Sequence, residues 1–312
     1  MLMKNKMLIT KRDLLRLVVC LFVVFQATAG MSQSKITIKN NLLYTDVSVF
    51  SSGLCCSTHE AIIDTGASVC FIDSTYAIDS CQIRGERINA TFGNTMGKTA
   101  NTSYVYLDSI AFGGVVYTKV RCYLVDMAGT LQQLAPKFII GGEVLKEGYW
   151  CCDLKENTFQ RLMSVPKNVV ATLKWKKYAD AALNHIYFEG KIGGKDTRIL
   201  FDTGALLNGL TYDFDLTPTE KVWLPSANMI DKLTYKEAGL CKNIPVEIAN
   251  YTFNLDFVKA LKAGPKSPRI NAGFLQGKKW VLDYKRRRLL ILDSEYNGRT
   301  CSMRYLPSSS YM

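Results

Sequence analysis

Two aspartates of the 312-residue chain stand in the same local sequence, almost half a chain length apart. Three apolar residues precede both Asp64 and Asp202, and Thr-Gly-Ala follows each of them. Two carboxylates brought close together cannot both ionise cheaply, so they share one proton. The ionised member can take a proton from water while the protonated member donates one to a carbonyl oxygen. This division of labour is the chemistry needed to hydrolyse an amide bond.

The repeat around the two aspartates extends further along both halves of the chain. After Asp64 an apolar run leads into Gly141-Gly142, and after Asp202 Ile270-Asn271-Ala272 leads into Gly273. In each half a tryptophan follows, and three residues later an aspartate: Trp150 and Asp153, then Trp280 and Asp283. A single Asp-Thr-Gly would indicate only a turn, because Asp and Gly are common turn formers. The doubled pattern instead predicts two halves descended from one ancestral unit.

Strand signals dominate the segments that must position these residues. Short β-branched and aromatic runs, separated by Gly, Asn and Asp, predict strands throughout both halves. Helical periodicity is short and local, around residues 131–135 and 257–262. We therefore expect an all-β chain in which a strand leads into each Asp-Thr-Gly, with the boundary between the halves near residues 166–174.

Residues 1–29 have the features of an export signal. Five cations precede an apolar run over residues 17–25, and Ala27-Thr28-Ala29 supplies a cleavage pattern. The run is shorter than the roughly 20 residues of a permanent membrane helix. We expect cleavage after Ala29, no stable membrane insertion afterwards, and a periplasmic, cell-envelope or extracellular protein. A lower-ranked alternative keeps the leader uncleaved as an anchor at the envelope.

The basic charge and the cysteines constrain the partners. The formal net charge is +12, but the densest cationic run, Lys285-Arg286-Arg287-Arg288, stands between apolar runs and predicts a solvated hairpin tip. Without a recognised nucleic-acid module we expect no nucleic-acid partner. Export permits disulfides, and an odd cysteine count after loss of Cys20 leaves a thiol unpaired. Cys241 and Cys301 are one candidate pair. No C-x-x-C is present, and we expect no metal or organic cofactor.

The doubled apolar-apolar-Asp-Thr-Gly pattern, with a glycine element downstream of each copy, resembles the pepsin and retropepsin superfamily of aspartic peptidases. The resemblance spans nearly the whole chain beyond the leader. It implies two homologous pepsin-like β-barrel lobes, residues 30–168 and 169–312, with the active site in the cleft between them. Asp64 and Asp202 would then be the catalytic pair of a monomeric enzyme.

The same resemblance assigns supporting roles around the pair. Thr65 and Thr203 would hydrogen-bond across a pseudo-twofold axis, and Gly66 and Gly204 would let the backbone turn tightly. Phe71 and Leu206, close after the two motifs, would be neighbours of the specificity pockets.

Residues 90–97 resemble the flap hairpin that closes over substrate, with Phe92 and Gly93 against it. Pepsin-like flaps usually carry a tyrosine where this chain has Phe92. Alanine follows both Asp-Thr-Gly motifs, as in retropepsins, where most pepsins have a hydroxyl residue. Loss of that hydroxyl predicts a working pH less acidic than that of pepsin.

The function implied is that of a secreted aspartic endopeptidase, which binds a peptide or protein substrate in extended form. Its competitor is a catalytically inactive pepsin-like binding protein of the cell envelope, favoured by Phe92 and by the uncommon number of cysteines. A histidine-dependent nucleophile has few options, because His59 and His185 are the two histidines of the chain. The absence of a Gly-x-Ser-x-Gly motif argues against an ordinary α/β-hydrolase.

Overall fold

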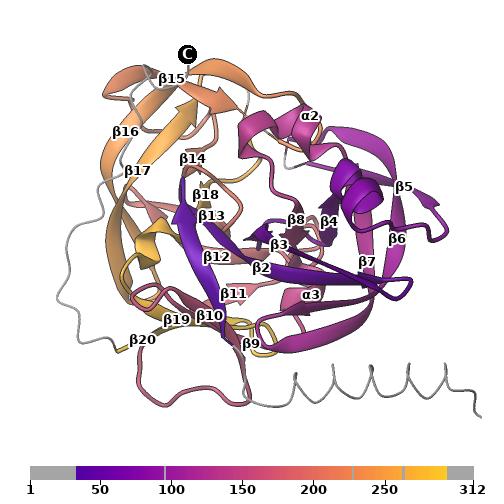
Figure 1. The fold of residues 1–312 in the computed structure, drawn as a ribbon. Helices are drawn as coiled ribbons and strands as arrows, with labels where there is room; N and C mark the ends of the chain where they lie inside the picture. Colours follow the sequence, from indigo (N-terminus) through magenta and orange to yellow (C-terminus); the bar gives the residue numbers. More distant parts are fainter. Residues whose placement is uncertain (1–32, 95, 227, 262–263, 294–312) are drawn as a thin grey trace, which may run out of the picture.

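The computed structural model describes residues 33–94, 96–226, 228–261 and 264–293 (Figure 1). The expected leader and Cys301 lie outside the described residues. Strands make up most of the described chain and helices are short. The prediction of an all-β protein is confirmed.

The first half forms a closed circuit of paired strands. Its strands are β1 (Ser34–Lys39), β2 (Leu42–Ser51), β3 (Leu54–Ile63), β4 (Cys70–Asp73), β5 (Ile88–Gly93), β6 (Thr99–Phe112), β7 (Val115–Val125), β8 (Phe138–Ile140), β9 (Tyr149–Asp153) and β10 (Thr158–Leu162). Its helical turns are η1 (Tyr76–Ser80), α2 (Met127–Leu131), η2 (Gln132–Leu134) and α3 (Gly142–Leu145). The pairings run β2–β3–β8–β4–β7–β6 and return to β2, while β5 pairs with β6 as a hairpin.

The second half repeats this circuit. Its elements are β11 (Val169–Lys176), β12 (Ile186–Ile192), β13 (Lys195–Phe201), β14 (Gly209–Leu210), β15 (Glu220–Ser226), β16 (Thr234–Ile248), β17 (Tyr251–Ala260), β18 (Arg269–Ile270), η3 (Ala272–Leu275), β19 (Lys279–Asp283) and β20 (Arg288–Leu292). The pairings run β12–β13–β18–β14–β17–β16 and return to β12. The hairpin of β15 and β16 is therefore the counterpart of the hairpin of β5 and β6.

The strands that lead into the two aspartates are covered on both faces. The last three residues of β3 and of β13 are buried, and each strand pairs in parallel with a short buried strand, β8 or β18. A strand covered on both faces needs continuous apolar residues rather than alternation. This requirement explains the apolar triplet before each Asp-Thr-Gly.

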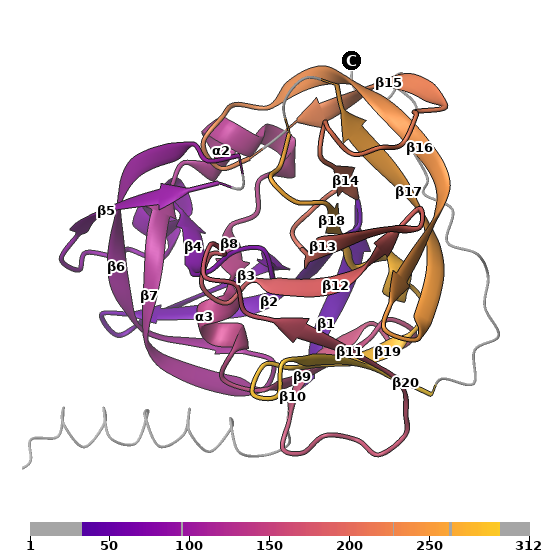
Figure 2. The ribbon, with the colours of Figure 1, turned by 180° about the vertical axis from the view of Figure 1, so that it is seen from behind.

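An antiparallel floor joins the halves, in the order β1–β10–β9–β19–β20–β11 (Figures 1 and 2). Cys151 pairs with Val281 at its centre, and Trp150 and Trp280 pair with Leu282 and Cys152 on either side. Exchange of the two halves leaves this register unchanged, so a pseudo-twofold axis passes between Cys151 and Val281. The floor thereby fixes one half relative to the other.

Aromatic side chains fill the space above the floor. Trp150 is fully buried and stacks on Phe112 and Phe159, with ring centroids 4.8 Å and 5.2 Å away. Gly113 approaches it closely, because a Cβ there would lie 2.5 Å from a ring carbon of Trp150. Trp280 is equally buried and meets Phe201 edge to face. The tryptophans of the repeat thus form equivalent parts of the core.

The observed elements bear on three predictions about local structure, two of helices and one of a hairpin tip. Helical turns span residues 127–134, which overlap the predicted 131–135, but the helix predicted over 257–262 is wrong. Residues 257–260 belong to β17, where Leu255 and Phe257 alternate inward and pair with β16. Residues 285–287 of the basic run form the predicted hairpin tip between β19 and β20, and Arg288 is the first residue of β20.

The eight described cysteines are all free thiols. Six of them are buried: Cys70, Cys81, Cys122, Cys151, Cys152 and Cys241. A buried thiol behaves as a small apolar side chain, which accounts for the strand positions of Cys151 and Cys152. The expected disulfides are thus not found in the described part of the chain.

No helix within residues 33–94, 96–226, 228–261 and 264–293 is long and apolar enough to cross a membrane.

Candidate active site

The two Asp-Thr-Gly loops occupy equivalent positions at the ends of β3 and β13. The Asp64 amide donates a hydrogen bond to the Ile140 carbonyl at 3.0 Å, and the Asp202 amide donates to the Ile270 carbonyl at 2.9 Å. Each loop is therefore attached to the short strand that runs beside its own lead-in strand. Two segments far apart in the sequence are brought to the centre of the molecule in this way.

Thr65 and Thr203 lock the loops to each other. The Thr65 amide donates to Thr203 Oγ1 and the Thr203 amide donates to Thr65 Oγ1, both at 3.0 Å. The hydroxyls then donate to carbonyls of the opposite strands, Thr65 to Phe201 at 2.9 Å and Thr203 to Ile63 at 2.6 Å. Both threonines are 0 % exposed, so these four hydrogen bonds form without competition from water.

The carboxyl group of each aspartate lies against the glycine of the opposite motif. A Cβ built on Gly66 would lie 2.5 Å from the carboxyl carbon of Asp202, and one on Gly204 would lie 2.3 Å from that of Asp64. Neither glycine adopts a positive φ. The sequence predicted that glycine is needed for a tight turn. The structure shows instead that glycine is needed because any side chain would occupy the space of the opposing carboxyl group.

Burial and mutual repulsion set the charge state of the pair. Asp64 Oδ1 accepts from the amides of Gly66 and Ala67 at 2.8 Å and 3.1 Å, and Asp202 Oδ1 accepts from the Gly204 amide at 3.0 Å. Burial, followed by the charge of Asp202, nevertheless raises the pKa of Asp64 well above its usual range. Asp64 therefore favours its protonated form beside the Asp202 carboxyl group.

Two asparagines form a second symmetric clamp that the sequence reasoning missed. Asn41 Nδ2 donates to the Leu206 carbonyl at 2.8 Å, and Asn184 Nδ2 donates to the Ser68 carbonyl at 3.3 Å. Each asparagine therefore supports the aspartate loop of the other half. A signal for it exists, because both asparagines begin an Asn-x-apolar-Tyr segment, at 41–44 and 184–187.

The residues that follow the short strands β8 and β18 are equivalent in a different alignment from the one expected from sequence, and Gly142 therefore has no glycine counterpart in the second half. The hydrogen bonds to Ile140 and Ile270 make Gly141 and Asn271 equivalent, rather than Gly142 and Gly273. A Cβ at Gly141 would lie 2.0 Å from a backbone oxygen. Asn271 instead places its side chain there and donates to the Ala205 and Leu206 carbonyls. The residue after the short strand thus contacts the aspartate loop in both halves, through its backbone at Gly141 and through its side-chain amide at Asn271.

The predicted flap is the hairpin of β5 and β6. Asn94 shapes its turn, because its side-chain oxygen accepts from the amides of Met96 and Lys98 at 3.0 Å. Phe92 is half-buried and meets Phe71 with ring centroids 5.5 Å apart. Phe71, Phe92, Leu206 and Met229 all belong to one apolar cluster that also contains Ala67. Residues from both halves therefore build the apolar surface next to Asp64.

The tips of the two hairpins meet. Lys98 Nζ lies 2.9 Å from each carboxylate oxygen of Asp231, and Asn94 Nδ2 lies 3.4 Å from Asn228 Oδ1. A second hairpin closing from the other half was not predicted, because residues 220–248 share no motif with residues 88–112.

One cation makes the site asymmetric. Arg269 Nη1 lies 3.8 Å from Asp202 Oδ2, and its equivalent in the first half is Ile139, as the strand pairings show. The Nε atom of Arg269 is buried and has no partner in the described chain. His59, by contrast, is exposed and pairs with Asp46. Within the described ranges no three His, Cys, Asp or Glu side chains gather to hold a metal ion.

Comparison with known proteins agrees with this geometry. Residues 49–144 match a family model described as aspartyl protease. The matched segment includes Asp64, the first hairpin and Gly141, and it ends before Asp202. A search of curated proteins gave no significant match. The match supports an aspartic peptidase family and, at a coarse level, peptidase activity.

Thr203→Val should destabilise the fold, because it removes one acceptor and one donor from the buried lock. We expect the free energy of unfolding to fall by about 2–3 kcal/mol, measured by urea denaturation. Thr203→Ser keeps the hydroxyl and should lose about 1 kcal/mol or less. A loss in Thr203→Val no larger than that in Thr203→Ser would contradict the role of the hydrogen bonds, because valine keeps the methyl group and lacks only the hydroxyl.

The raised pKa of Asp64 predicts how stability depends on pH. Above about pH 4 the unfolded chain releases a proton that the folded state retains, so stability falls as the pH rises toward the raised pKa. Asp64→Asn has no carboxyl group to ionise and so avoids this loss. Its free energy of unfolding should exceed that of the wild type by about 1 kcal/mol or more at neutral pH.

The measurement is urea unfolding at a series of pH values, and the advantage of Asp64→Asn should shrink toward pH 4. Asp196→Asn is the matched control, since the Asp196 side chain is exposed and only its backbone takes part in the pairing of β13 with β12. An advantage that is independent of pH, or that grows in acid, contradicts the assignment.

Proposed function

We propose that this chain is an exported aspartic endopeptidase with two pepsin-like lobes, residues 30–168 and 169–312. One observation carries the proposal: each carboxyl group of the Asp64–Asp202 pair lies in space left by the glycine of the opposite motif. The equivalent strand circuits of the halves support the lobes, and the family match supports the reaction class.

The reaction follows from a pair that holds one proton. The ionised carboxylate takes a proton from a water molecule as its oxygen attacks the peptide carbonyl carbon. The protonated carboxyl group donates its proton to the carbonyl oxygen, which yields a neutral tetrahedral intermediate. The C–N bond then breaks as the leaving nitrogen takes a proton from one member of the pair, while a hydroxyl of the intermediate returns its proton to the other member and the carboxylic acid product forms. The pair ends the cycle with one proton, as it began.

The two hairpins suggest how a substrate is held. An extended peptide would lie between the aspartate loops and the hairpin of β5 and β6, with its backbone hydrogen-bonded near Phe92 and Gly93. The apolar cluster around Phe71, Leu206 and Met229 favours an apolar side chain next to the cleaved bond. Entry requires the tips to separate, which breaks the solvent-exposed pair of Lys98 and Asp231, a weak interaction.

The main competitor is a pepsin-like binding protein of the cell envelope without catalytic activity. It is favoured by Phe92, which offers no hydroxyl at the flap position. Export itself is proposed on the character of residues 1–29.

The test is cleavage of a mixed peptide library by the chain that begins at Gly30, from about pH 3 to about pH 8. We expect cleavage between apolar residues, inhibition by pepstatin, and a loss of about 10³-fold or more in both Asp64→Asn and Asp202→Asn. Asp196→Asn, the same chemical change at an exposed site, should retain full activity. If the folded wild type cleaves nothing at any pH, the binding protein replaces the peptidase.

A further inference from the structure

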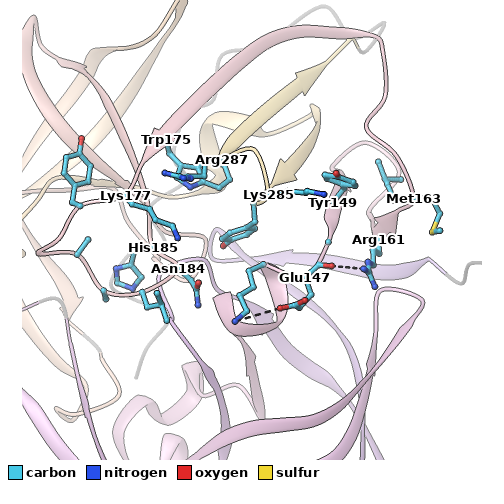
Figure 3. A pocket seen from close by; sticks show the side chains of 18 residues that line it. Glu147, Tyr149, Arg161, Met163, Trp175, Lys177, Asn184, His185, Lys285 and Arg287 are labelled. Atoms are coloured by element: carbon cyan, nitrogen blue, oxygen red, sulfur yellow. Dashed lines mark hydrogen bonds and ion pairs between the residues drawn. The ribbon is translucent and has the colours of Figure 1, made fainter.

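A cavity of about 630 Å³ lies between the floor and the segment that joins β11 to β12 (Figure 3). Its walls come from the segment after α3, the end of β10, residues 175–185 and the turn between β19 and β20. None of its lining residues belongs to either hairpin. It is therefore a different space from the one that the hairpins cover.

Cations dominate its lining. Five cationic residues line the cavity and only one acidic residue, Glu147, does; the cations are Lys146, Arg161, Lys177, Lys285 and Arg287. Lys146 Nζ lies 3.9 Å from Glu147 Oε1, and Arg161 donates to the Glu147 carbonyl at 2.7 Å. The side chains of Lys177, Lys285 and Arg287 have no hydrogen bond or ion pair with any other described residue. A concave surface lined by one sign of charge concentrates the field that attracts the opposite sign.

The turn between β19 and β20 divides its basic run between two tasks. Arg286 and Arg288 reach back to the buried carboxylate of Asp283, at 3.8 Å and 2.8 Å. Lys285, which precedes Arg286, and Arg287, which lies between the two arginines, line the cavity instead. Figure 3 shows them between Lys177 on one side and Arg161 on the other. The run is thus more than the solvated tip that the sequence predicted.

The walls also offer aromatic surface and unused hydrogen-bonding atoms. Trp175 and Tyr284 meet edge to face with centroids 5.4 Å apart. The Tyr284 hydroxyl and His185 Nδ1 are buried and lack a partner among the described residues. Burial raises the pKa of Tyr284, so its hydroxyl keeps its proton, and burial lowers the pKa of His185 despite nearby Asp202. Both groups are therefore neutral and add no charge of their own to the cavity wall.

We propose that this cavity binds a phosphate monoester, with the phosphate held by Lys177, Lys285 and Arg287 and the organic body packed against Trp175 and Tyr284. Three unpaired cations suit a group that carries nearly two negative charges better than a single carboxylate. The volume lies within the range of small-molecule sites and far exceeds that of a phosphate ion alone. The aromatic walls favour a ligand with an apolar part.

The test is calorimetric titration of the chain that begins at Gly30, with phenyl phosphate, inorganic phosphate and phenol as probes, at about 0.15 M salt. Phenyl phosphate should bind about threefold or more tightly than inorganic phosphate, because the ring gains aromatic contact. Phenol should show no binding. Equal binding of the two phosphates overturns the organic part of the proposal.

The variant Lys285→Gln/Arg287→Gln should weaken phenyl phosphate binding by about tenfold or more, since two charged contacts are lost. Lys174→Gln/Lys191→Gln is the matched control, because these exposed lysines lie outside the cavity and it removes the same charge. It should bind within about twofold of the wild type. Absence of binding by the wild type, or equal weakening in both variants, overturns the site. Peptide cleavage plays no part in this readout, so the outcome is independent of the proposed peptidase.

Discussion

The exchange of hydrogen bonds between Thr65 and Thr203 is the interaction on which the rest of the site depends. Two carboxylates repel each other when both are ionised, and burial adds to the cost of charge. A lock made of neutral hydroxyls and amides holds the two loops together without adding charge of its own. Because both threonines are fully buried, the lock holds the two loops together without competition from water.

Other contacts distribute the same constraint through the fold. The floor centred on Cys151 and Val281 sets the relation of the halves, and Asn41 and Asn184 each support the opposite loop. The symmetry is incomplete where one half has diverged. Asn271 replaces a glycine, and Arg269 lies beside Asp202 with no cation in the equivalent place. The hydrogen bonds of Thr65 and Thr203 are thus symmetric, whereas the residues around the two aspartates differ between the halves.

Much of this arrangement could be predicted from sequence, because the decisive residues recur. The strand-forming runs indicated the all-β fold, and the doubled Asp-Thr-Gly, each copy after an apolar triplet, predicted the meeting of Asp64 and Asp202. Features with no repeat to reveal them were missed, such as the hairpin of β15 and β16 and the pairing of Lys98 with Asp231. Their contacts join segments that share no motif. The false helix at 257–262 shows strand pairing overriding a local pattern.

The cysteines and the basic run show a different limit. Residue types alone allow disulfides, but whether two thiols meet depends on the path of the chain, and six of the described thiols are simply core residues. Likewise, the composition of residues 285–288 could not reveal that alternate side chains point to Asp283 and to a cavity. Such information resides in the turn geometry.

The central claim is that the Asp64–Asp202 pair works while it holds one proton. The most direct test is the pH dependence of kcat/KM for the best peptide substrate, from about pH 2 to about pH 9. We predict a bell-shaped profile, with one carboxyl group ionising on the acid side and the remaining proton leaving on the alkaline side, and an optimum well above pH 2. A rate that rises to a plateau and stays there at high pH would mean that one ionised group suffices, and it would contradict the shared proton.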